Sequence, residues 1–464
     1  MTHWVPLAVV ACYVVALFAV TWWSQRLAAS GGIVGYLLAG RQLPYWVTAA
    51  ALAGLAVGGA STIGVAEAAY KSGFSAGWYN AAWAAGAFVM GLLTAGRYRR
   101  LELTTLPEFF DRHYGTAARV LAVLGQLAIQ VVVTSLQYVA GGAILSSLMP
   151  GVFTFRSGMV VTAVVFIGIT LIGGLWATGL TNVLNVAVIY VGIVAGVVLT
   201  VGRIGGFAGL LRQLPAGHPG FDLWAVGAGL IAGWFMVMIT TAQSTQAVVQ
   251  ISFASKDDRS ARWGFLLGGL LIFPVGFLCA IIGMAAAVLH PSIVAAEALP
   301  RAVLDLPPLA AGLVLSGLWA ADVSTASALL MGSASLVLND IVKRFIRPGL
   351  GDVHGRAVCR LTVLALSVVT YLLALFVSGI LKMLLIGLTL TTAFTLVVLM
   401  TMFWPAVCRQ SSATWTMVAT YLSLAGWLAA PASWHFLPHP IYFTWLISLV
   451  AFFAVTALDR RRIA

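Results

Sequence analysis

The chain has 464 residues, of which 61% are hydrophobic and only 8% are charged, and its mean hydropathy is +1.02. Soluble globular domains carry roughly 25% charged residues, so the composition excludes that class and indicates a polytopic, all-α membrane protein. The net charge of +12 would favour nucleic-acid binding in a soluble protein. In a membrane protein, basic loops set the topology instead, and we expect no nucleic-acid partner.

Apolar stretches long enough to cross a bilayer, roughly 17 to 25 residues each, recur along the whole chain. We count thirteen, centred near residues 14, 57, 86, 133, 167, 191, 237, 276, 322, 369, 393, 421 and 449. Most of the 25 Lys and Arg residues fall in loops on one side if the N-terminus lies outside. The positive-inside rule then predicts an inner (plasma) membrane protein with a cytoplasmic C-terminus.

Two of these stretches are interrupted by small and polar residues where a plain membrane helix would be rich in leucine. They are the second stretch, "ALAGLAVGGASTIGVAEAAY" (51–70), and the seventh, "GWFMVMITTAQSTQAVVQ" (233–250). Interrupted helices at corresponding places in two halves are typical of inverted-repeat transporters, whose site lies at the bilayer midplane. Close helix packing through small residues is the alternative explanation.

Acidic residues at membrane depth are costly and usually functional, and this chain places two of its thirteen acids there. Glu67 stands four residues before Lys71 near the outer end of the second stretch, so we expect an interfacial ion pair. Asp322 has no basic residue within a helical turn. A cation- or proton-coupling role is the hypothesis for Asp322, and a structurally bonded carboxyl is the alternative.

Hydroxyl groups surround Asp322 on the ninth stretch. Ala321, Ser324, Thr325 and Ala328 stand at positions i, i+3, i+4 and i+7 and therefore share one helix face. Hard cations prefer oxygen ligands, which this face and an unwound second helix could supply together. Serine and threonine in membrane helices also bond their own backbone or hold helices together, so spacing alone does not decide.

Several motifs resemble those of the solute:sodium symporter family, which includes sodium/proline, sodium/galactose and sodium/sialic acid transporters. They occur in the family's order and spacing over residues 36 to about 345. The motifs are "YLLAGRQLPYW" (36–46), "GVAEAAYKSGFSAGWY" (64–79), "TTLPEFFDRHYG" (104–115), "TQAVVQISFASKDDRSAR" (245–262), "AADVST" (320–325) and "LVLNDIVKRF" (336–345).

The resemblance implies a LeuT-type core of two inverted five-helix repeats. It divides the chain into a first flanking helix with its inner loop (1–44), the first repeat (45–203), the second repeat (204–410), and two flanking helices with a basic tail (411–464). It also implies a sodium site between the second and ninth helices. By this likeness the hydroxyl ligands are Ser324 and Thr325, and the main-chain carbonyl ligands are Ala321, Gly54 and Val57.

Departures from the family pattern limit the coupling. Members with a second sodium site carry an acid where Asn182 stands here, and paired serines where this chain has Ser327 and Ala328. We therefore predict one sodium ion per cycle. The family usually has an apolar residue at Asp322, so the resemblance assigns this carboxyl no role.

The resemblance places the solute beside the broken second helix, among neutral polar side chains and an aromatic wall that suit a small polar organic solute. The residues are Ser61, Thr62, Asn80, Trp234, Thr241 and Gln243. Sodium is the predicted coupling ion, and a monomer suffices. Proton-coupled symport through Asp322 and a receptor that binds solute without moving it stay open. An enzyme is not expected, because the chain has no HExxH, no GxSxG and no paired midplane acids.

Overall fold

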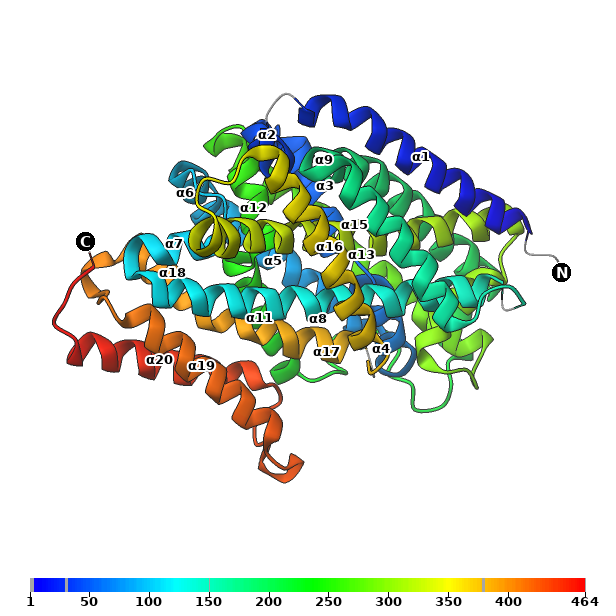
Figure 1. Ribbon diagram of the computed structural model, residues 1–464. Helices are drawn as coiled ribbons and strands as arrows, with labels where there is room; N and C mark the ends of the chain where they lie inside the picture. Colours follow the sequence, from blue (N-terminus) through cyan, green and yellow to red (C-terminus); the bar gives the residue numbers. More distant parts are fainter. Residues whose placement is uncertain (1–3, 30–31, 150, 378–379, 464) are drawn as a thin grey trace.

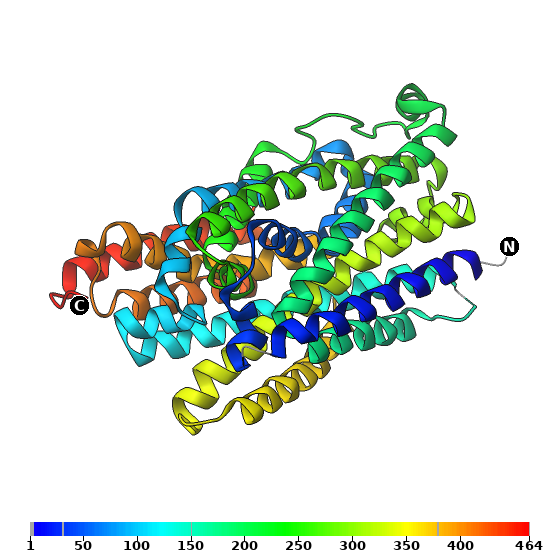
Figure 2. The same cartoon turned by 90° about the horizontal axis from the view of Figure 1, so that it is seen from above.

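The computed structural model describes residues 4–29, 32–149, 151–377 and 380–463, and these ranges contain helices and no β-strand. Most long helices run between the two ends of one elongated bundle, and the two chain termini lie at opposite ends (Figures 1 and 2). We call these ends the N-terminal side and the C-terminal side. The predicted all-α architecture is confirmed for the described residues.

All thirteen predicted stretches fall on a helix or on helices separated by a short break. Eight described helices are long and apolar enough to cross a membrane, or nine if the broken second helix is included, so thirteen crossings stay a prediction. The helices of the two interrupted stretches are described below. The other helices of eight or more residues are, in chain order, α1 (Trp4–Ala29), α5 (Trp78–Leu93), α7 (Leu106–Tyr114), α8 (Thr116–Leu148), α9 (Phe155–Arg203), α10 (Gly206–Gln213), α13 (Asp258–Leu289), α15 (Pro308–Leu336), η5 (Val337–Ile346), α16 (Asp352–Ala374), α17 (Ile380–Leu388), α18 (Thr392–Phe403), α19 (Ser412–Ala429) and α20 (Pro440–Leu458).

The fifth and sixth stretches share the single element α9, which contains two helices joined at Gly174, a residue with φ of 61°. Gly168 lies against Phe18 of α1, and Asn185 accepts a hydrogen bond from Tyr13 of the same helix. Gly168 and Asn185 are seventeen residues apart, so along one straight helix they would be separated by about 25 Å. The two residues that they contact, Tyr13 and Phe18, are separated by only about one and a half helical turns. The chain therefore reverses direction at Gly174.

The two interrupted stretches are broken helices, as predicted. The second consists of α3 (Tyr45–Ala56), a break at residues 57–59, the π-helix η2 (Ala60–Gly64) and α4 (Val65–Ser72). The seventh consists of α11 (Ala228–Ser244) and α12 (Gln246–Ala254), with the break at Thr245, whose backbone is extended. We call them broken helix two and broken helix seven.

Helix α15 lies at the centre of the bundle, and all its residues from Val314 to Leu336 are buried. A helix that is apolar on all faces is expected in such a position. It packs mainly against α9, α8 and α1 and also touches α3. Asp322, Ser324 and Thr325 are therefore carried into the protein interior and face other helices.

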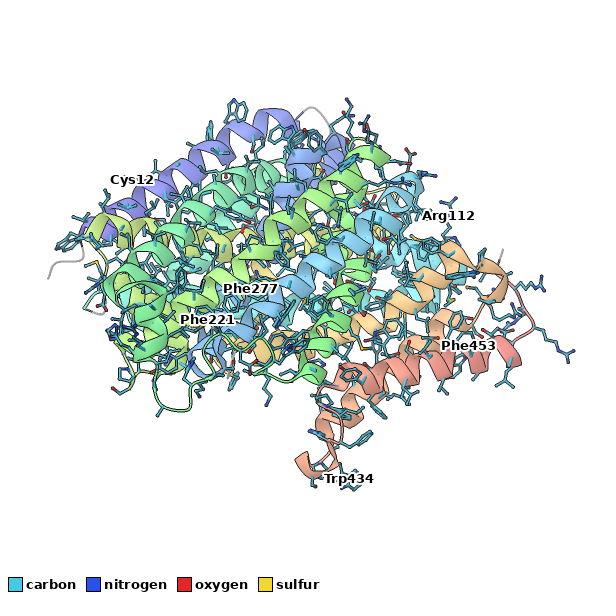
Figure 3. All side chains as sticks on the ribbon, turned by 180° about the vertical axis from the view of Figure 1, so that it is seen from behind. Cys12, Arg112, Phe221, Phe277, Trp434 and Phe453 are labelled. Carbon is cyan, nitrogen blue, oxygen red and sulfur yellow. The ribbon has the colours of Figure 1, made fainter. Side chains whose placement is uncertain are left out.

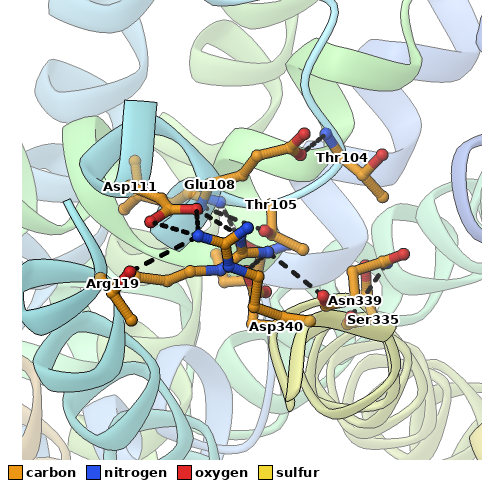
Figure 4. A network of polar contacts seen from close by, with 12 residues as sticks. Thr104, Thr105, Glu108, Asp111, Arg119, Ser335, Asn339 and Asp340 are labelled. Carbon is orange, nitrogen blue, oxygen red and sulfur yellow. Dashed lines mark hydrogen bonds and ion pairs between the residues drawn. The ribbon is translucent and has the colours of Figure 1, made fainter. Parts of the chain in front are cut away.

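Charged side chains fasten the C-terminal side (Figure 4). Arg119 of α8 forms ion pairs of 2.7 Å with Asp111 of α7 and of 2.7 Å with Asp340 of η5, and Arg344 lies 3.3 Å from Asp111. Helices α19 and α20 extend away from the body of the bundle. Trp434 lies at the tip of the segment that joins them (Figure 3).

Candidate sodium and solute sites

The hydroxyls of Ser324 and Thr325 meet the end of α3, where broken helix two loses its regular hydrogen bonds. Ser324 Oγ lies 2.7 Å from the Gly54 carbonyl and 2.9 Å from the Ala321 carbonyl. Thr325 Oγ1 lies 3.0 Å from the Gly54 carbonyl and 3.1 Å from that of Leu55. Five oxygen atoms from two helices thus converge in the buried core.

This cluster contains more hydrogen-bond acceptors than hydrogens that could be donated to them. Each hydroxyl has one hydrogen and two lone pairs, whereas the two hydroxyls contact three carbonyl oxygens. A hard cation with oxygen ligands could bind here if the two hydroxyls turned their hydrogens away and offered lone pairs, with the oxygens moving slightly apart to admit it. The residues present therefore fit a sodium ion, which would be held by Gly54, Leu55, Ala321, Ser324 and Thr325.

The carbonyl of Leu55 was not among the predicted ligands, and Val57 was. Val57 begins the break, and its N–H donates to the Ala53 carbonyl over 2.8 Å. Among the described hydrogen bonds, the Leu55 carbonyl contacts Thr325, and the carbonyl of Val57 makes no contact to α15. Helical spacing on α15 could predict the hydroxyl pair, but the residue at which α3 unwinds was not readable from the sequence.

Two glycines let the break approach α8 and α15 closely. A Cβ at Gly58 would lie 2.5 Å from Thr325 Oγ1, and a Cβ at Gly59 would lie 2.6 Å from Asp322 Oδ1. Gln137 of α8 accepts the N–H of Gly59 at 2.9 Å. The side-chain amide therefore replaces a helical partner that the break removes, and Gln137 is a site residue that sequence reasoning missed.

Asp322 borders the sodium-type cluster without joining it. The side chain is fully buried, and neither carboxyl oxygen has a hydrogen-bond partner among the described residues. Its Oδ1 faces the backbone of Gly59. A buried carboxyl with no partner is costly unless it is neutral or bound to a cation, and Asp322 meets this cost directly beside the oxygen cluster.

A small cavity adjoins the cluster. Its volume is about 30 Å³, and its wall includes Gly58, Thr325, Gln137, Thr241 and the aromatic ring of Tyr79. A cavity needs roughly 10–15 Å³ to hold one water molecule. This space therefore fits a water molecule or an ion, and a solute needs the surrounding side chains to move.

The six residues predicted for the solute do not line one cavity. Ser61 and Thr62 donate to the Ala56 and Gly58 carbonyls over 2.5 and 3.1 Å and so stabilise the break itself. Asn80 is buried, and its side-chain amide has no partner among the described residues. Thr241 lines the small cavity.

The remaining two predicted solute residues lie elsewhere on broken helix seven. Trp234 lines a separate, larger cavity on the N-terminal side. Gln243 accepts a hydrogen bond of 2.5 Å from Thr94, and its main-chain carbonyl accepts one of 2.6 Å from Tyr98. Sequence alone could not reveal these contacts, because Thr94 and Tyr98 are about 150 residues away along the chain.

Gln126 of α8 forms hydrogen bonds with backbone groups at the break of helix seven, as Gln137 does at the break of helix two. Its Nε2 donates to the Ser244 carbonyl at 2.6 Å, and its Oε1 accepts the N–H of Gln246 at 2.8 Å. Both glutamines are buried in α8. The sequence signal that could have identified them is the group of three buried glutamines on this largely apolar helix, Gln126, Gln130 and Gln137.

Comparison with known proteins identifies the family to which the chain is similar. The profile described as the sodium:solute symporter family matches residues 36–419. The chain is 26% identical to sodium/glucose cotransporter 4 of Danio rerio, over 78% of this chain and 62% of that protein. It is 27% identical to the osmoregulated proline transporter OpuE of Bacillus subtilis, over 78% of this chain and 76% of that protein.

Solved structures give the same result for the fold. A sodium-coupled sialic acid symporter in a substrate-bound outward-open state has a TM-score of 0.82 at 17% identity, and the match covers 99% of both chains. The nucleobase-cation-symport-1 transporter Mhp1 in a closed conformation has a TM-score of 0.64 at 15% identity, over 91% of this chain and 92% of Mhp1. The predicted LeuT-type fold is confirmed.

Proposed function

The chain belongs to the sodium:solute symporter family, a class of sodium-coupled secondary transporters, and we propose that it imports a small polar organic solute by alternating access with one sodium ion per cycle. The convergence of Ser324 and Thr325 on the Gly54 carbonyl carries this proposal. The sodium gradient across the membrane would drive transport, and the bound ion would hold α3 against α15. Because residues of both α3 and α15 line the adjoining small cavity, the bound ion would also fix the shape of that cavity.

The proposal includes a direction and a unit of function. The basic loops favour a cytoplasmic C-terminal side, so sodium and solute would enter from the N-terminal side of an inner membrane. A monomer contains both broken helices and is proposed to suffice. Two five-helix repeats, residues 45–203 and 204–410, would form the moving parts, with residues 1–44 and 411–464 flanking them.

The stoichiometry of one follows from the neighbourhood of Asn182. Its Oδ1 accepts from Asn185 at 3.1 Å, and its Nδ2 lies 3.4 Å from the Ala51 carbonyl. An amide pair tied to the backbone offers no negative charge for a second cation. Ser327 donates to the Val323 carbonyl at 2.7 Å within its own helix, which supports the same proposal.

Thermal stability of the purified chain in sodium, potassium or choline tests the site. We expect sodium alone to raise the melting temperature, and we expect Ser324→Ala and Thr325→Val to lose this shift. Thr325→Val keeps the shape and removes the hydroxyl, whereas Thr325→Ser keeps the hydroxyl and is the matched control. Equal sodium shifts in Thr325→Val and Thr325→Ser would contradict the proposed site.

Asp322 keeps proton coupling open as the second candidate, because its carboxyl is buried without a partner beside the cluster. Uptake into proteoliposomes under separate sodium and proton gradients distinguishes the two candidates. Sodium-driven uptake that persists in Asp322→Asn, with changed sodium affinity, supports the sodium mechanism. Uptake driven by protons and lost in Asp322→Asn would support the alternative, and solute binding without any uptake would indicate a receptor.

A further inference from the structure

A second, much larger cavity lies on the N-terminal side of the bundle, away from the oxygen cluster. Its volume is about 730 Å³, within the range of small-molecule sites. Its wall is formed by α4, α11, α17 and the segment that joins α19 to α20. In the proposed topology it lies on the outer side of the membrane, beside the outer ends of both broken helices.

Two buried hydrogen-bond donors in this wall have no partner. Trp234 Nε1 and His439 Nε2 are both unpaired among the described residues, and the two side chains are only 3% and 6% exposed. Their backbones come close together, because a Cβ at Gly233, the residue before Trp234, would lie 3.2 Å from His439 Cβ. Buried donors without partners are rare in native proteins and call for a ligand or an ordered water.

The hydrogen bonds of His439 decide which ring nitrogen carries the hydrogen. Its Nδ1 accepts the N–H of Ile441 at 3.2 Å, as the N-cap of α20. Burial lowers the pKa of His439 to about 4, so the ring is neutral near pH 7. A neutral ring that accepts at Nδ1 carries its hydrogen on Nε2. Nε2 is therefore a donor, like the indole nitrogen of Trp234.

The charged groups in the wall favour an anion. Lys71 and Lys382 line the cavity together with one acid, Glu67. The expected Glu67–Lys71 ion pair is not among the ion pairs of the described residues; the Glu67 carboxylate instead accepts the N–H of Ile380. Both lysines are exposed, so their ammonium groups stay available to a ligand.

We propose that this cavity is an outer binding site for solutes that carry a carboxylate. Lys71 and Lys382 attract the carboxylate, and the N–H groups of Trp234 and His439 hold it once these enclosed side chains turn toward the cavity. This inference rests on the proposed transport function and narrows its substrate class. A carboxylate accepts hydrogen bonds and donates none, which matches the polar side chains of this largely apolar wall, since most of them are donors. A sugar would need as many acceptors as donors. An ammonium group on the same solute could pair with Glu67.

The experiment compares acids with their own amides, using the purified full-length chain. Acetate, propionate, lactate and proline are paired with acetamide, propionamide, lactamide and prolinamide, at constant chloride, in sodium and again in choline. We expect at least one acid to raise the melting temperature more than its amide. Trp234→Phe and His439→Asn should weaken that acid roughly tenfold or more, because each loses one hydrogen bond to a charged group.

The two variants are chosen to keep the fold. Trp234→Phe retains an aromatic ring, and His439→Asn retains an N-cap acceptor while it removes the Nε2 donor. Trp224→Phe, which alters a 61% exposed tryptophan before α11, is the matched control and should bind the acid normally. If the favoured acid is proline and lactate has no effect, a zwitterion that also uses Glu67 is indicated within the same class.

Failure of this inference is separable from failure of the transport proposal. If no acid exceeds its amide, or if both variants bind the acid like the native chain, the carboxylate site is overturned while the sodium shift still stands. If sodium gives no shift in the native chain, the sodium site fails, and the acid–amide comparison in choline still reports on the outer cavity. Both variants should keep the sodium shift in full.

Discussion

Broken helix two and broken helix seven are both interrupted in the core, but different side chains bind the backbone carbonyls that the two breaks leave unpaired. Each loses backbone hydrogen bonds in the core, and each is supported by a glutamine of α8. In helix seven, the Ser244 carbonyl is taken by Gln126 and the Gln243 carbonyl by Tyr98, both at 2.6 Å. In helix two, the free carbonyls face the hydroxyls of Ser324 and Thr325.

The difference lies in the chemistry of the partners. In helix seven, one carbonyl is held by the Gln126 amide N–H, which can only donate, and the other by the Tyr98 hydroxyl. In helix two, both partners are hydroxyls from neighbouring residues of α15, and each can donate and accept. When a cation enters, a serine or threonine hydroxyl can turn its lone pairs inward, and the carbonyls beside it become ligands. We therefore propose that broken helix two binds the ion and that broken helix seven forms a fixed bend, although both are interrupted in the same way.

The largest effect is expected from Arg119→Ala, which should loosen both breaks together. Arg119 anchors α8 to Asp111 and Asp340, and α8 carries both supporting glutamines. Removing one partner of a buried ion pair costs about 3–5 kcal/mol, so thermal unfolding should shift strongly downward. Arg301→Ala, at an exposed pair with Glu297, should cost under about 1 kcal/mol. Equal losses in the two variants would contradict a structural role for the buried network.

Gly59→Ala should damage broken helix two alone. The added Cβ would lie 2.3 Å from Ala140 Cβ and 2.6 Å from Asp322 Oδ1, so the break must move away from α8 and α15. Overpacking of this kind costs about 1–3 kcal/mol, and sodium affinity measured by thermal shift should fall. Gly426→Ala in α19 meets nothing within 4 Å and is the control, with unchanged sodium affinity.

Much of this architecture was predictable because it follows from local composition. Apolar length predicted the helices, small polar residues predicted both breaks, and helical spacing put Ser324 and Thr325 on one face. The family motifs then predicted the partner helix, and the family match confirms the resemblance on which that prediction rests. These features are short-range properties of the chain, which physical rules read directly.

The parts that could not be predicted depend on contacts between distant segments. Gln126 meets Ser244 across 118 residues, and Gln137 meets Gly59 across 78. His439 joins the wall of the outer cavity although its neighbour Trp234 lies some 200 residues earlier. A buried glutamine needs a partner, which Gln126 and Gln137 find and Gln130 does not among the described residues, and spacing along the chain does not say which residue that partner is. The expected Glu67–Lys71 pair was wrong for the same reason, since Ile380 supplies the partner.

Removing the two glutamines one at a time tests whether the breaks are independent. Gln126→Leu leaves the Ser244 carbonyl and the Gln246 N–H unpaired, at about 1–3 kcal/mol for each buried group. Gln137→Leu leaves only the Gly59 N–H without its partner and should cost about half as much. Sodium affinity should fall in Gln137→Leu and stay unchanged in Gln126→Leu. A sodium defect in both would mean that the two breaks move as one unit.

The smallest effect on sodium is expected from Ser244→Ala, the counterpart in helix seven of Ser324→Ala. Ser244 Oγ contacts Thr395 Oγ1 at 2.6 Å and the Thr391 carbonyl at 3.1 Å, so its loss should cost about 1 kcal/mol of unfolding free energy. Because the carbonyls of this break are already held by dedicated donors, the sodium-induced thermal shift should not change. If Ser244→Ala lowered sodium affinity as much as Ser324→Ala does, hydroxyls at either break would bind the ion, and the contrast between the two broken helices would fail.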